Sequence, residues 1–159
     1  LVHPFHTRRF LEEVTIPRLE DGIGAVGRSR DDVVVIPTVL TCAYRNEEER
    51  ERALRGVRMN LAFYGSTPAY RATLEMHGWG EIQAELNRLT KEGRWDEIPA
   101  CIDDEVLHTI AVVGTPVEIG REMAVRYRDV AARVGLSMPY QHGDDLLAEV
   151  VSEIRVASS

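Results

Sequence analysis

Histidine, aromatic and arginine residues gather at two places in the chain where they could line a pocket. His3 and His6 flank Pro4-Phe5 near the amino terminus, and a second group lies between residues 70 and 79. The second group can orient a small molecule, but it is equally well explained as core rings and an arginine paired with a carboxylate. The two histidines could line the rim of an α/β sheet, or they could be solvated or capping residues. The candidate pocket residues are His3, His6, Tyr70, Arg71, His77 and Trp79.

The two amino-terminal histidines do not predict a metal centre. Imidazoles three residues apart hold a metal ion only with further ligands, and the sequence offers no identifiable third one. Cys42 and Cys101 are the only cysteines, and they form no C-x-x-C pair, which is typical of ordinary reduced thiols. We therefore expect no metal, and the residues name no general acid or general base.

Gly22-Ile23-Gly24-Ala25-Val26-Gly27 matches the letters of the dinucleotide-binding pattern G-x-G-x-x-G. In a dinucleotide fold this pattern follows a strand and opens a helix, so that backbone amides meet the pyrophosphate. Here the glycines end a helical pattern and precede a strand pattern. We interpret them as a frayed helix terminus with a glycine cap.

Length and composition predict one globular domain. The 159 residues are 44% hydrophobic and 28% charged, with a formal net charge of −7. A chain of this size buries roughly 68–70% of its unfolded surface, enough for a core without disulfides or metal. The acidic total argues against nucleic-acid binding. No apolar run approaches the roughly 20 residues that span a bilayer, and no signal segment opens the chain, so we expect a cytoplasmic protein without a membrane partner.

The first third of the chain predicts alternating strands and helices. Leu1-Val2 resembles the end of a strand, and the apolar spacing from Thr7 to Gly27 predicts a helix kinked at Pro17. The β-branched run Val33–Thr41 is too continuous for a strand with one wet face and indicates a buried parallel strand. Asn46 and Glu49 form a capping pattern for a helix that ends near residue 65.

The rest of the chain predicts a helix-rich stretch and a further strand–helix unit. Short helices are expected between Thr67 and Thr109, interrupted around Gly78-Trp79-Gly80. Residues 110–113 are either a strand or a buried loop. Thr115-Pro116-Val117-Glu118 is a capping box that opens a long helix, with an apolar stripe reaching Val134. A short strand, Leu136–Tyr140, and an amphipathic helix over 144–156 follow.

Strands that alternate with helices imply right-handed crossovers and an α/β fold. An open parallel sheet of three strands would leave two bare edges that can recruit other chains, and we expect a homo-oligomer. A (β/α)8 barrel takes roughly 250 residues. We therefore interpret residues 1–159 as the carboxyl-terminal portion of a TIM barrel, strands six to eight, with a helical insertion at about 65–109.

Several stretches are similar to a known family. They are His-Pro-Phe-His-Thr, Pro-Arg-Leu-Glu-x-Gly, Gly-Arg-Ser-Arg-Asp-Asp, Phe-Tyr-Gly-Ser-Thr-Pro-Ala-Tyr-Arg, His-Gly-Trp-Gly and Val-Val-Gly-Thr-Pro-Val-Glu. Together they resemble the carboxyl-terminal part of the luciferase-like monooxygenase superfamily, in its deazaflavin (F420)-dependent oxidoreductase branch. The resemblance places Leu1-Val2 in barrel strand six, Val33–Thr41 in strand seven and Leu136–Tyr140 in strand eight.

The resemblance implies hydride transfer between F420, or alternatively FMN, and a small organic substrate. Family members bind the cofactor at the carboxyl ends of the barrel strands, so the six candidate residues would line the rim and lid of the pocket. Much of the cofactor contact would precede Leu1, and we expect negligible cofactor binding by these residues alone. The alternative is a non-catalytic α/β binding or assembly module that lacks the cofactor site.

Overall fold

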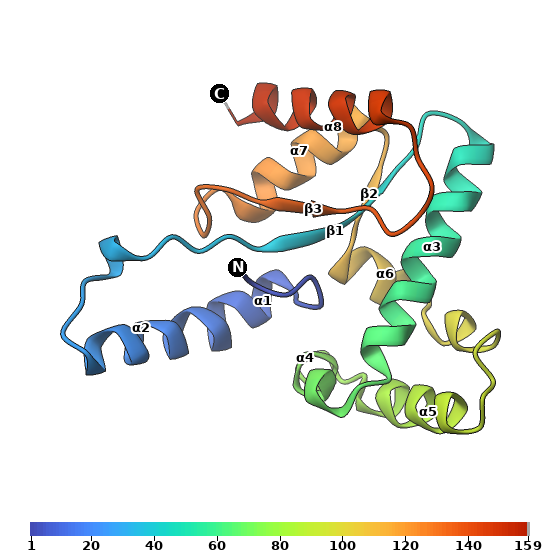
Figure 1. Cartoon of the computed structure of the whole chain (residues 1–159), viewed down its shortest axis with the longest axis horizontal. Coiled ribbons are helices and arrows are strands. Elements are labelled where there is room, and N and C mark those ends of the chain that lie inside the picture. The colour runs from blue at the N-terminus through green and yellow to red at the C-terminus, as the bar shows by residue number, and fades with distance from the viewer. Residues whose placement is uncertain (159) are drawn as a thin grey trace.

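The computed structural model describes residues 1–158, which form a small parallel sheet surrounded by helices (Figure 1). The predicted α/β class is confirmed at this level. The strands are β1 (Thr38–Ala43), β2 (Val112–Gly114) and β3 (Gly135–Ser137). None of the helices in the described part of the chain has the length and apolar character needed to cross a membrane.

The predicted first helical segment exists, and its hydrogen-bonding pattern changes just before Pro17. α1 (Arg8–Phe10) continues through a π-helical stretch, Leu11–Thr15, into α2 (Ile16–Ala25). Pro17 has no N–H to donate to the preceding turn, and Ile16 just before it donates to the carbonyl of Leu11, five residues back. The irregularity at the proline is therefore a widened π-helical turn.

The end of α2 confirms the helix-terminus interpretation of the glycine pattern. Gly22 and Gly24 lie inside the helix, and Gly27 follows it with φ +67°. The N–H of Arg28 bonds the carbonyl of Ile23, and the N–H of Gly27 bonds that of Gly24. This pair of bonds is the Schellman cap, which needs the left-handed conformation that glycine adopts without strain.

Strand β1 exists where the apolar run predicted a buried strand, but the predicted bounds Val33–Thr41 are wrong. The strand begins after Pro37 and ends at Ala43. Pro37 itself forms only an isolated parallel bridge with Val2, in which Val2 donates to the carbonyl of Ile36 and accepts from the residue after the proline. The residues before Pro37 are β-branched and apolar, yet within residues 1–158 they pair with no strand.

The sheet has the order β2-β1-β3, with both neighbours parallel to β1. Thr38 donates to the carbonyl of Val2, and Tyr44 donates to that of Gly114. Thr38 and Tyr44 are six residues apart, and backbone groups an even number of residues apart point to the same edge of a strand. Val2 and β2 therefore lie one after the other along one edge of β1, and β3 lies along the other edge. Leu1-Val2, expected to end a strand, contributes only the bridge at Val2.

A helical segment connects β1 to β2. Asn46 caps its first helix by accepting the N–H of Glu49 at 2.9 Å, and Asp103 caps the last by accepting that of Val106 at 2.9 Å. Gly78, at φ +79°, makes the predicted break. The helices are α3 (Glu47–Gly65), α4 (Arg71–Glu75), α5 (Gly80–Lys91) and α6 (Asp104–Ile110), with 3-10 turns at Pro68–Tyr70 and Ile98–Cys101.

The last third forms a strand–helix–strand–helix unit. Residues 112–114 are a strand, which settles the alternative left open for 110–113. The N–H of Thr115 donates to Glu118 at 2.7 Å in the predicted capping box of α7 (Pro116–Tyr127).

Two predicted bounds in this unit are wrong. α7 ends at Tyr127, so Val130 and Val134 pack on the same core from the following loop. β3 covers Gly135–Ser137 instead of Leu136–Tyr140, because pairing with β1 stops at Leu40. The chain closes with α8 (Asp144–Ala157).

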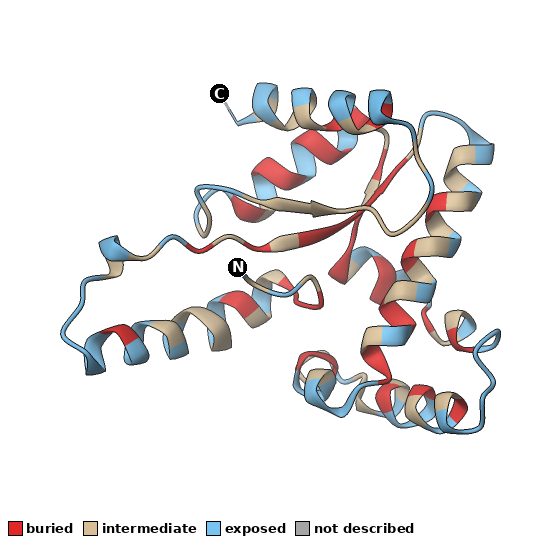
Figure 2. Cartoon of the chain, viewed as in Figure 1, coloured by how far each residue is buried: buried red, intermediate tan, exposed pale blue. Residues whose placement is uncertain are grey.

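β1 is covered on both faces, as expected for a buried parallel strand (Figure 2). Leu40 and Cys42 face a core built with α3, α5 and α6. Val39 and Ala43 face a second core built with α7 and α8. Within residues 1–158, β2 and β3 each pair only with β1, so the strand edges without a partner are the outer edges of the sheet.

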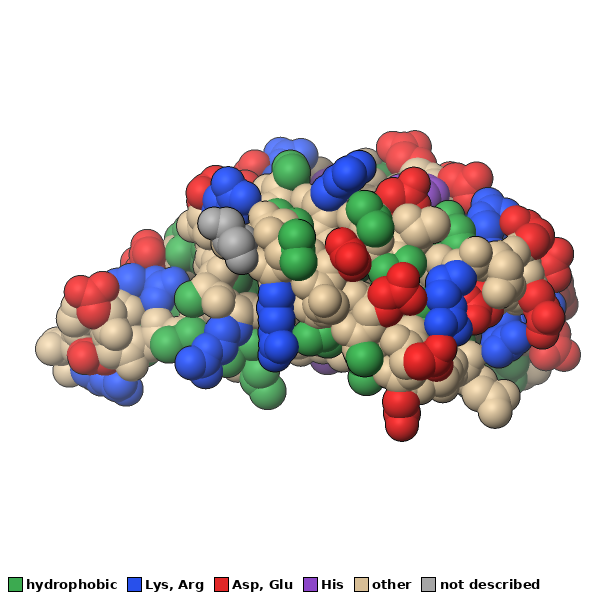
Figure 3. All heavy atoms as spheres, turned by 90° about the horizontal axis from the view of Figure 1, so that it is seen from above, with side chains coloured by type: hydrophobic (Ala, Val, Ile, Leu, Met, Phe, Trp, Pro, Cys, Tyr) green, Lys and Arg blue, Asp and Glu red, His purple; other side chains and the backbone are tan. Residues whose placement is uncertain are grey.

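Charged side chains of both signs are interspersed over the face shown in Figure 3. Most of the ion pairs within residues 1–158 join residues three or four positions apart, such as Arg88 with Glu85 and Glu92. Exposed pairs of this kind contribute little stability. The charged surface therefore marks solvated helix faces.

Candidate functional site

The carboxyl ends of the strands lead into loops that carry aromatic side chains. Tyr44 follows β1, Tyr140 follows β3, and His3 follows the bridge residue Val2. In parallel α/β folds ligands bind at this end of the sheet. α3 packs beside it at Gly56, where a Cβ would lie 2.7 Å from the carbonyl oxygen of Pro139 and 2.7 Å from Cβ of Tyr140.

Tyr140 joins the loop after β3 to the end of β1. Its hydroxyl accepts the N–H of Ala43 at 2.8 Å and donates to the carbonyl of Ala43 at 3.1 Å. Burial raises the pKa of Tyr140, so the hydroxyl stays protonated and can donate. The sequence analysis missed this residue, and its position just past a strand end is the signal that could have found it.

His3 and Tyr70, two of the predicted pocket residues, are stacked with ring centroids 4.7 Å apart. Tyr64 meets His3 edge-on at 4.6 Å, and Phe5 tilts against Tyr70 at 5.4 Å. These four residues, His3, Phe5, Tyr64 and Tyr70, are called the aromatic cluster below. The cluster joins the amino-terminal loop to the helical segment, so the structure brings residues about 67 positions apart into one group.

His6 lies apart from the aromatic cluster. It is 2% exposed, its Nδ1 is 2.8 Å from the carbonyl oxygen of His3, and its Nε2 is 3.3 Å from the hydroxyl of Tyr127 on α7. The carbonyl requires a proton on Nδ1, so Nε2 accepts from Tyr127. Burial is the main cause of the lowered pKa of His6. Its described contacts are those of a packed, neutral core histidine.

His77 and Trp79 form a second stack, with centroids 4.7 Å apart. Nε2 of His77 lies 2.9 Å from the hydroxyl oxygen of Thr7, and Arg9 donates to the carbonyl of Met76 at 3.1 Å. Burial, with a smaller effect of Arg9, lowers the pKa of His77. These contacts hold the start of the first helix against the turn between α4 and α5.

Arg71 points into a polar network instead of joining the aromatic cluster. Its Nε donates to Glu75 at 2.6 Å, and it also donates to Gln83 at 3.3 Å. Gln83 is buried and donates in turn to the carbonyl of Ser66 at the end of α3, where Asn87 also donates at 2.9 Å. This is the carboxylate pairing that the sequence left open as the alternative to a pocket role.

Asn60 is the second residue that the sequence analysis missed. Its Oδ1 is buried and has no hydrogen-bond partner within residues 1–158. It lies on α3 one helical turn after Gly56 and one turn before Tyr64, so the three share a face of the helix. The signal in the sequence is an amide within the apolar stripe of Val57 and Leu61.

His3 and Cys42, near the strand ends, are neutral at neutral pH, whereas Arg45, two residues after β1, forms ion pairs with Glu49 and Asp145. Burial lowers the pKa of His3 below its ordinary value of 6.5. Burial also raises the pKa of the Cys42 thiol to about 12. Within residues 1–158 no cluster of three or more His, Cys, Asp or Glu side chains is arranged to hold a metal ion. These groups can therefore stack, accept hydrogen bonds and exclude water.

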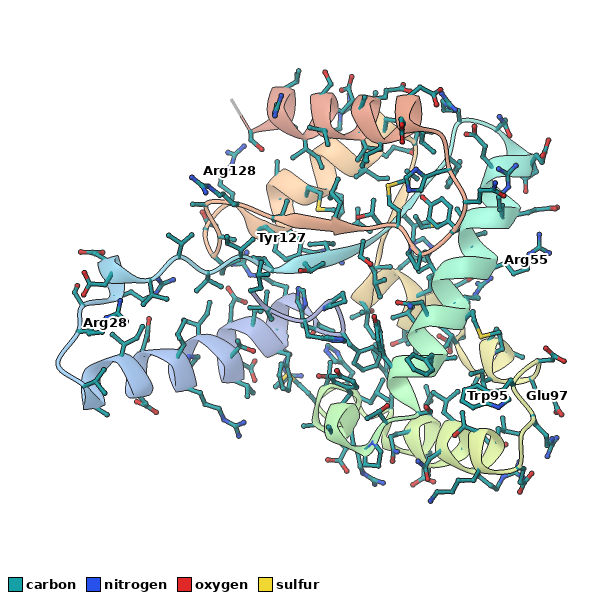
Figure 4. All side chains as sticks on the ribbon, viewed as in Figure 1. Arg28, Arg55, Trp95, Glu97, Tyr127 and Arg128 are labelled. Carbon is teal, nitrogen blue, oxygen red and sulfur yellow. The ribbon has the colours of Figure 1, made fainter. Side chains whose placement is uncertain are left out.

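A hollow lies elsewhere, between α7, β3 and α8. It has a volume of about 640 Å³, and its walls include Met123, Tyr127, Leu136 and Ile154 as well as three arginine side chains. Figure 4 shows Tyr127 and Arg128, two of its lining residues, at the end of α7. None of its lining residues belongs to the aromatic cluster.

The fold and its strand-end rings define an α/β protein whose parallel sheet carries aromatic side chains at its carboxyl end. The family model of luciferase-like monooxygenases matches residues 1–133. The chain belongs to this family. The resemblance stated from its motifs is thereby confirmed.

The chain is also similar to individual proteins. The chain is 41% identical over 134 residues to uncharacterized proteins of Mycobacterium tuberculosis and Mycobacterium bovis. It is 27% identical over 126 residues to a 5,10-methylenetetrahydromethanopterin reductase of Archaeoglobus fulgidus, covering 75% of this chain and 36% of that protein. The match to the mycobacterial proteins covers 84% of this chain but only 39% of their length.

Proposed function

We propose that these residues are part of an oxidoreductase that uses F420, or alternatively a flavin, to exchange a hydride with a small organic substrate. In this proposal they form strands six to eight of a (β/α)8 barrel together with its helical segment. The observation that carries it is that the sheet is covered on both faces while β2 and β3 each have one neighbour within residues 1–158.

The outer edge of β3 supports continuation into a larger sheet. An unpaired parallel strand leaves N–H and C=O groups without partners, and barrel closure removes such edges. The hollow of about 640 Å³ between α7, β3 and α8 is lined by apolar side chains including Met123 and Leu136, with Arg128, Arg133 and Arg155 also on its walls. A further strand–helix unit would pair with β3 and pack its helix into this hollow.

The residues at the strand ends fit a planar heterocycle. The aromatic cluster and Tyr140 offer apolar ring surfaces, and the buried Oδ1 of Asn60 lacks a donor. A deazaflavin or flavin, when bound, supplies a ring that takes up or releases a hydride. His3, Tyr64 and Tyr140 would hold such a ring in place and keep water from it.

In this proposal the predicted pocket residues have different roles. His3 and Tyr70 line the pocket through the aromatic cluster, and His77 and Trp79 hold the helical segment as its cover. His6 and Arg71 support these elements from behind. The substrate stays a small organic molecule of unassigned structure, and homo-oligomer formation and cytoplasmic location stay predictions.

A cofactor titration of the full gene product that encodes these residues tests the proposal. F420 and FMN are added separately and binding is followed by fluorescence, with riboflavin as a control for non-specific ring binding. Saturable binding of F420 or FMN supports the oxidoreductase. A stable, colourless protein that binds neither would favour the non-catalytic module.

A further inference from the structure

We propose that Asn60 binds the polar edge of the planar ring in this site, accepting an N–H through Oδ1 and donating Nδ2–H to a neighbouring carbonyl. This inference rests on the proposed function. It assigns a ligand contact to the helical segment, through a residue that the sequence motifs did not single out.

The first argument is the state of the amide. Oδ1 of Asn60 is buried without a hydrogen-bond partner in the described part of the chain. A buried acceptor without a donor is costly, and such atoms are rare in folded proteins. Arg58 has a similarly unpartnered Nε, but its guanidinium also pairs with Asp104, so that side chain has another role. The Asn60 side chain makes no hydrogen bond or ion pair within residues 1–158.

The second argument is position. One turn before Asn60, α3 touches Tyr140 at Gly56, and one turn after it, Tyr64 meets His3 edge-on at 4.6 Å. Both contacts are made by residues that follow strand or bridge positions. Arg55, on another side of α3, points away from the sheet (Figure 4). The amide therefore lies between two groups of rings that face the strand ends.

The third argument is chemical complementarity. A carboxamide offers one acceptor and one donor side by side, and it pairs with a ligand edge that carries N–H next to C=O. Deazaflavin and flavin rings have such an imide edge opposite their apolar benzenoid side. Aromatic residues on either side of Asn60 suit the flat faces of the same ring. A carboxylate at position 60 could accept the N–H but could not donate to the carbonyl.

The test compares Asn60→Leu and Asn60→Asp with wild type in the full gene product. Dissociation constants for F420 and FMN are measured by fluorescence titration, and the Tm is measured without ligand. We expect binding about tenfold weaker in Asn60→Leu. We also expect the unliganded Tm of Asn60→Leu to rise by about 2 °C, because the unpaired buried acceptor is removed.

Asn87→Leu is the matched control, because that amide already donates to Ser66 at 2.9 Å. It should lower the Tm and leave the dissociation constant unchanged. Wild-type affinity in Asn60→Leu would overturn the assignment of Asn60 while leaving the proposed function intact. A wild-type protein that binds neither F420 nor FMN would overturn both.

Discussion

The hydroxyl of Tyr140 is bonded to both polar groups of Ala43, at 2.8 Å from the nitrogen and 3.1 Å from the oxygen. The N–H and C=O of one residue in a strand point to the same edge, here the edge that β3 occupies further back. The pairing of β1 with β3 stops at Leu40. Three residues later, at Ala43, the Tyr140 hydroxyl makes the hydrogen bonds at this edge. A side chain thus completes the hydrogen bonding at the end of β1.

Tyr140→Phe tests this contact. The variant keeps the ring but removes the hydroxyl that accepts the N–H of Ala43, so we expect the free energy of unfolding to fall by about 1–3 kcal/mol. Urea denaturation measures the change. Tyr70→Phe is the control, because Tyr70 interacts through its ring, and it should change stability by less than about 0.5 kcal/mol. Equal effects of the two substitutions would argue against the contact.

Gly56→Ala and Gly24→Ala should have opposite effects, although both replace a glycine inside a helix. A Cβ at Gly56 would lie 2.7 Å from Pro139 and Tyr140 atoms, whereas nothing lies within 4 Å of one at Gly24. We expect Gly56→Ala to lower the free energy of unfolding by about 1–3 kcal/mol. Gly24→Ala should raise it by up to about 1 kcal/mol. A stabilising Gly56→Ala would mean that α3 does not approach this loop.

His6 should make stability depend on pH. Burial lowers its pKa from 6.5, so between 6.5 and the folded value the unfolded chain binds more protons than the folded one. The free energy of unfolding therefore falls as the pH falls through 6.5, by about 1.4 kcal/mol for each unit of pKa difference. Burial of His3 and His77 acts in the same direction.

Denaturation of His6→Gln at pH values from about 7.5 to 5 measures this contribution. We expect a flatter pH profile than that of wild type. If His6→Gln kept the full wild-type slope, the buried neutral histidine would not be its source.

The two cysteines should differ in reactivity. Cys42 is 0% exposed in β1, and burial raises the pKa of its thiol to about 12. Cys101 is only partly buried, and its pKa is raised by burial as well. Iodoacetamide should modify Cys101 slowly in the native protein and Cys42 only after unfolding, because the thiolate must form and be accessible. Mass spectrometry of the labelled peptides measures the two reactions. Equal labelling of Cys42 and Cys101 in the native protein would refute the assignment of Cys42 to the core.

Local rules predicted the parts of the fold that depend on neighbouring residues. Asn46 caps a helix by a bond to Glu49 three residues on, and Gly27 closes a Schellman cap, so their chemistry is visible in a short window of sequence. The extent of strands is different, because it depends on a partner. Val33–Ile36 are as apolar as β1. The two segments differ in pairing, because the residues after Pro37 pair with β3 whereas those before it pair with no strand within residues 1–158.

The same difference between local motifs and contacts across the fold applies to the candidate site. The motifs that contain His3, Tyr70, His77 and Trp79 pointed to residues that the structure joins in two stacks. Nothing in the sequence distinguished them from His6, which packs against Tyr127 from another element. Asn60 and Tyr140 were missed because their significance lies in what they contact, or lack, across the fold.

The most direct test of the central claim is a pair of fluorescence titrations with F420 and FMN, one on the 159-residue chain and one on the full gene product. The claim is that these residues supply only one side of a shared barrel site. We predict that the longer protein binds one of the two cofactors and that the 159 residues alone bind neither measurably. Tight binding by the 159 residues alone would contradict the shared site, and no binding by the longer protein would contradict the proposed function.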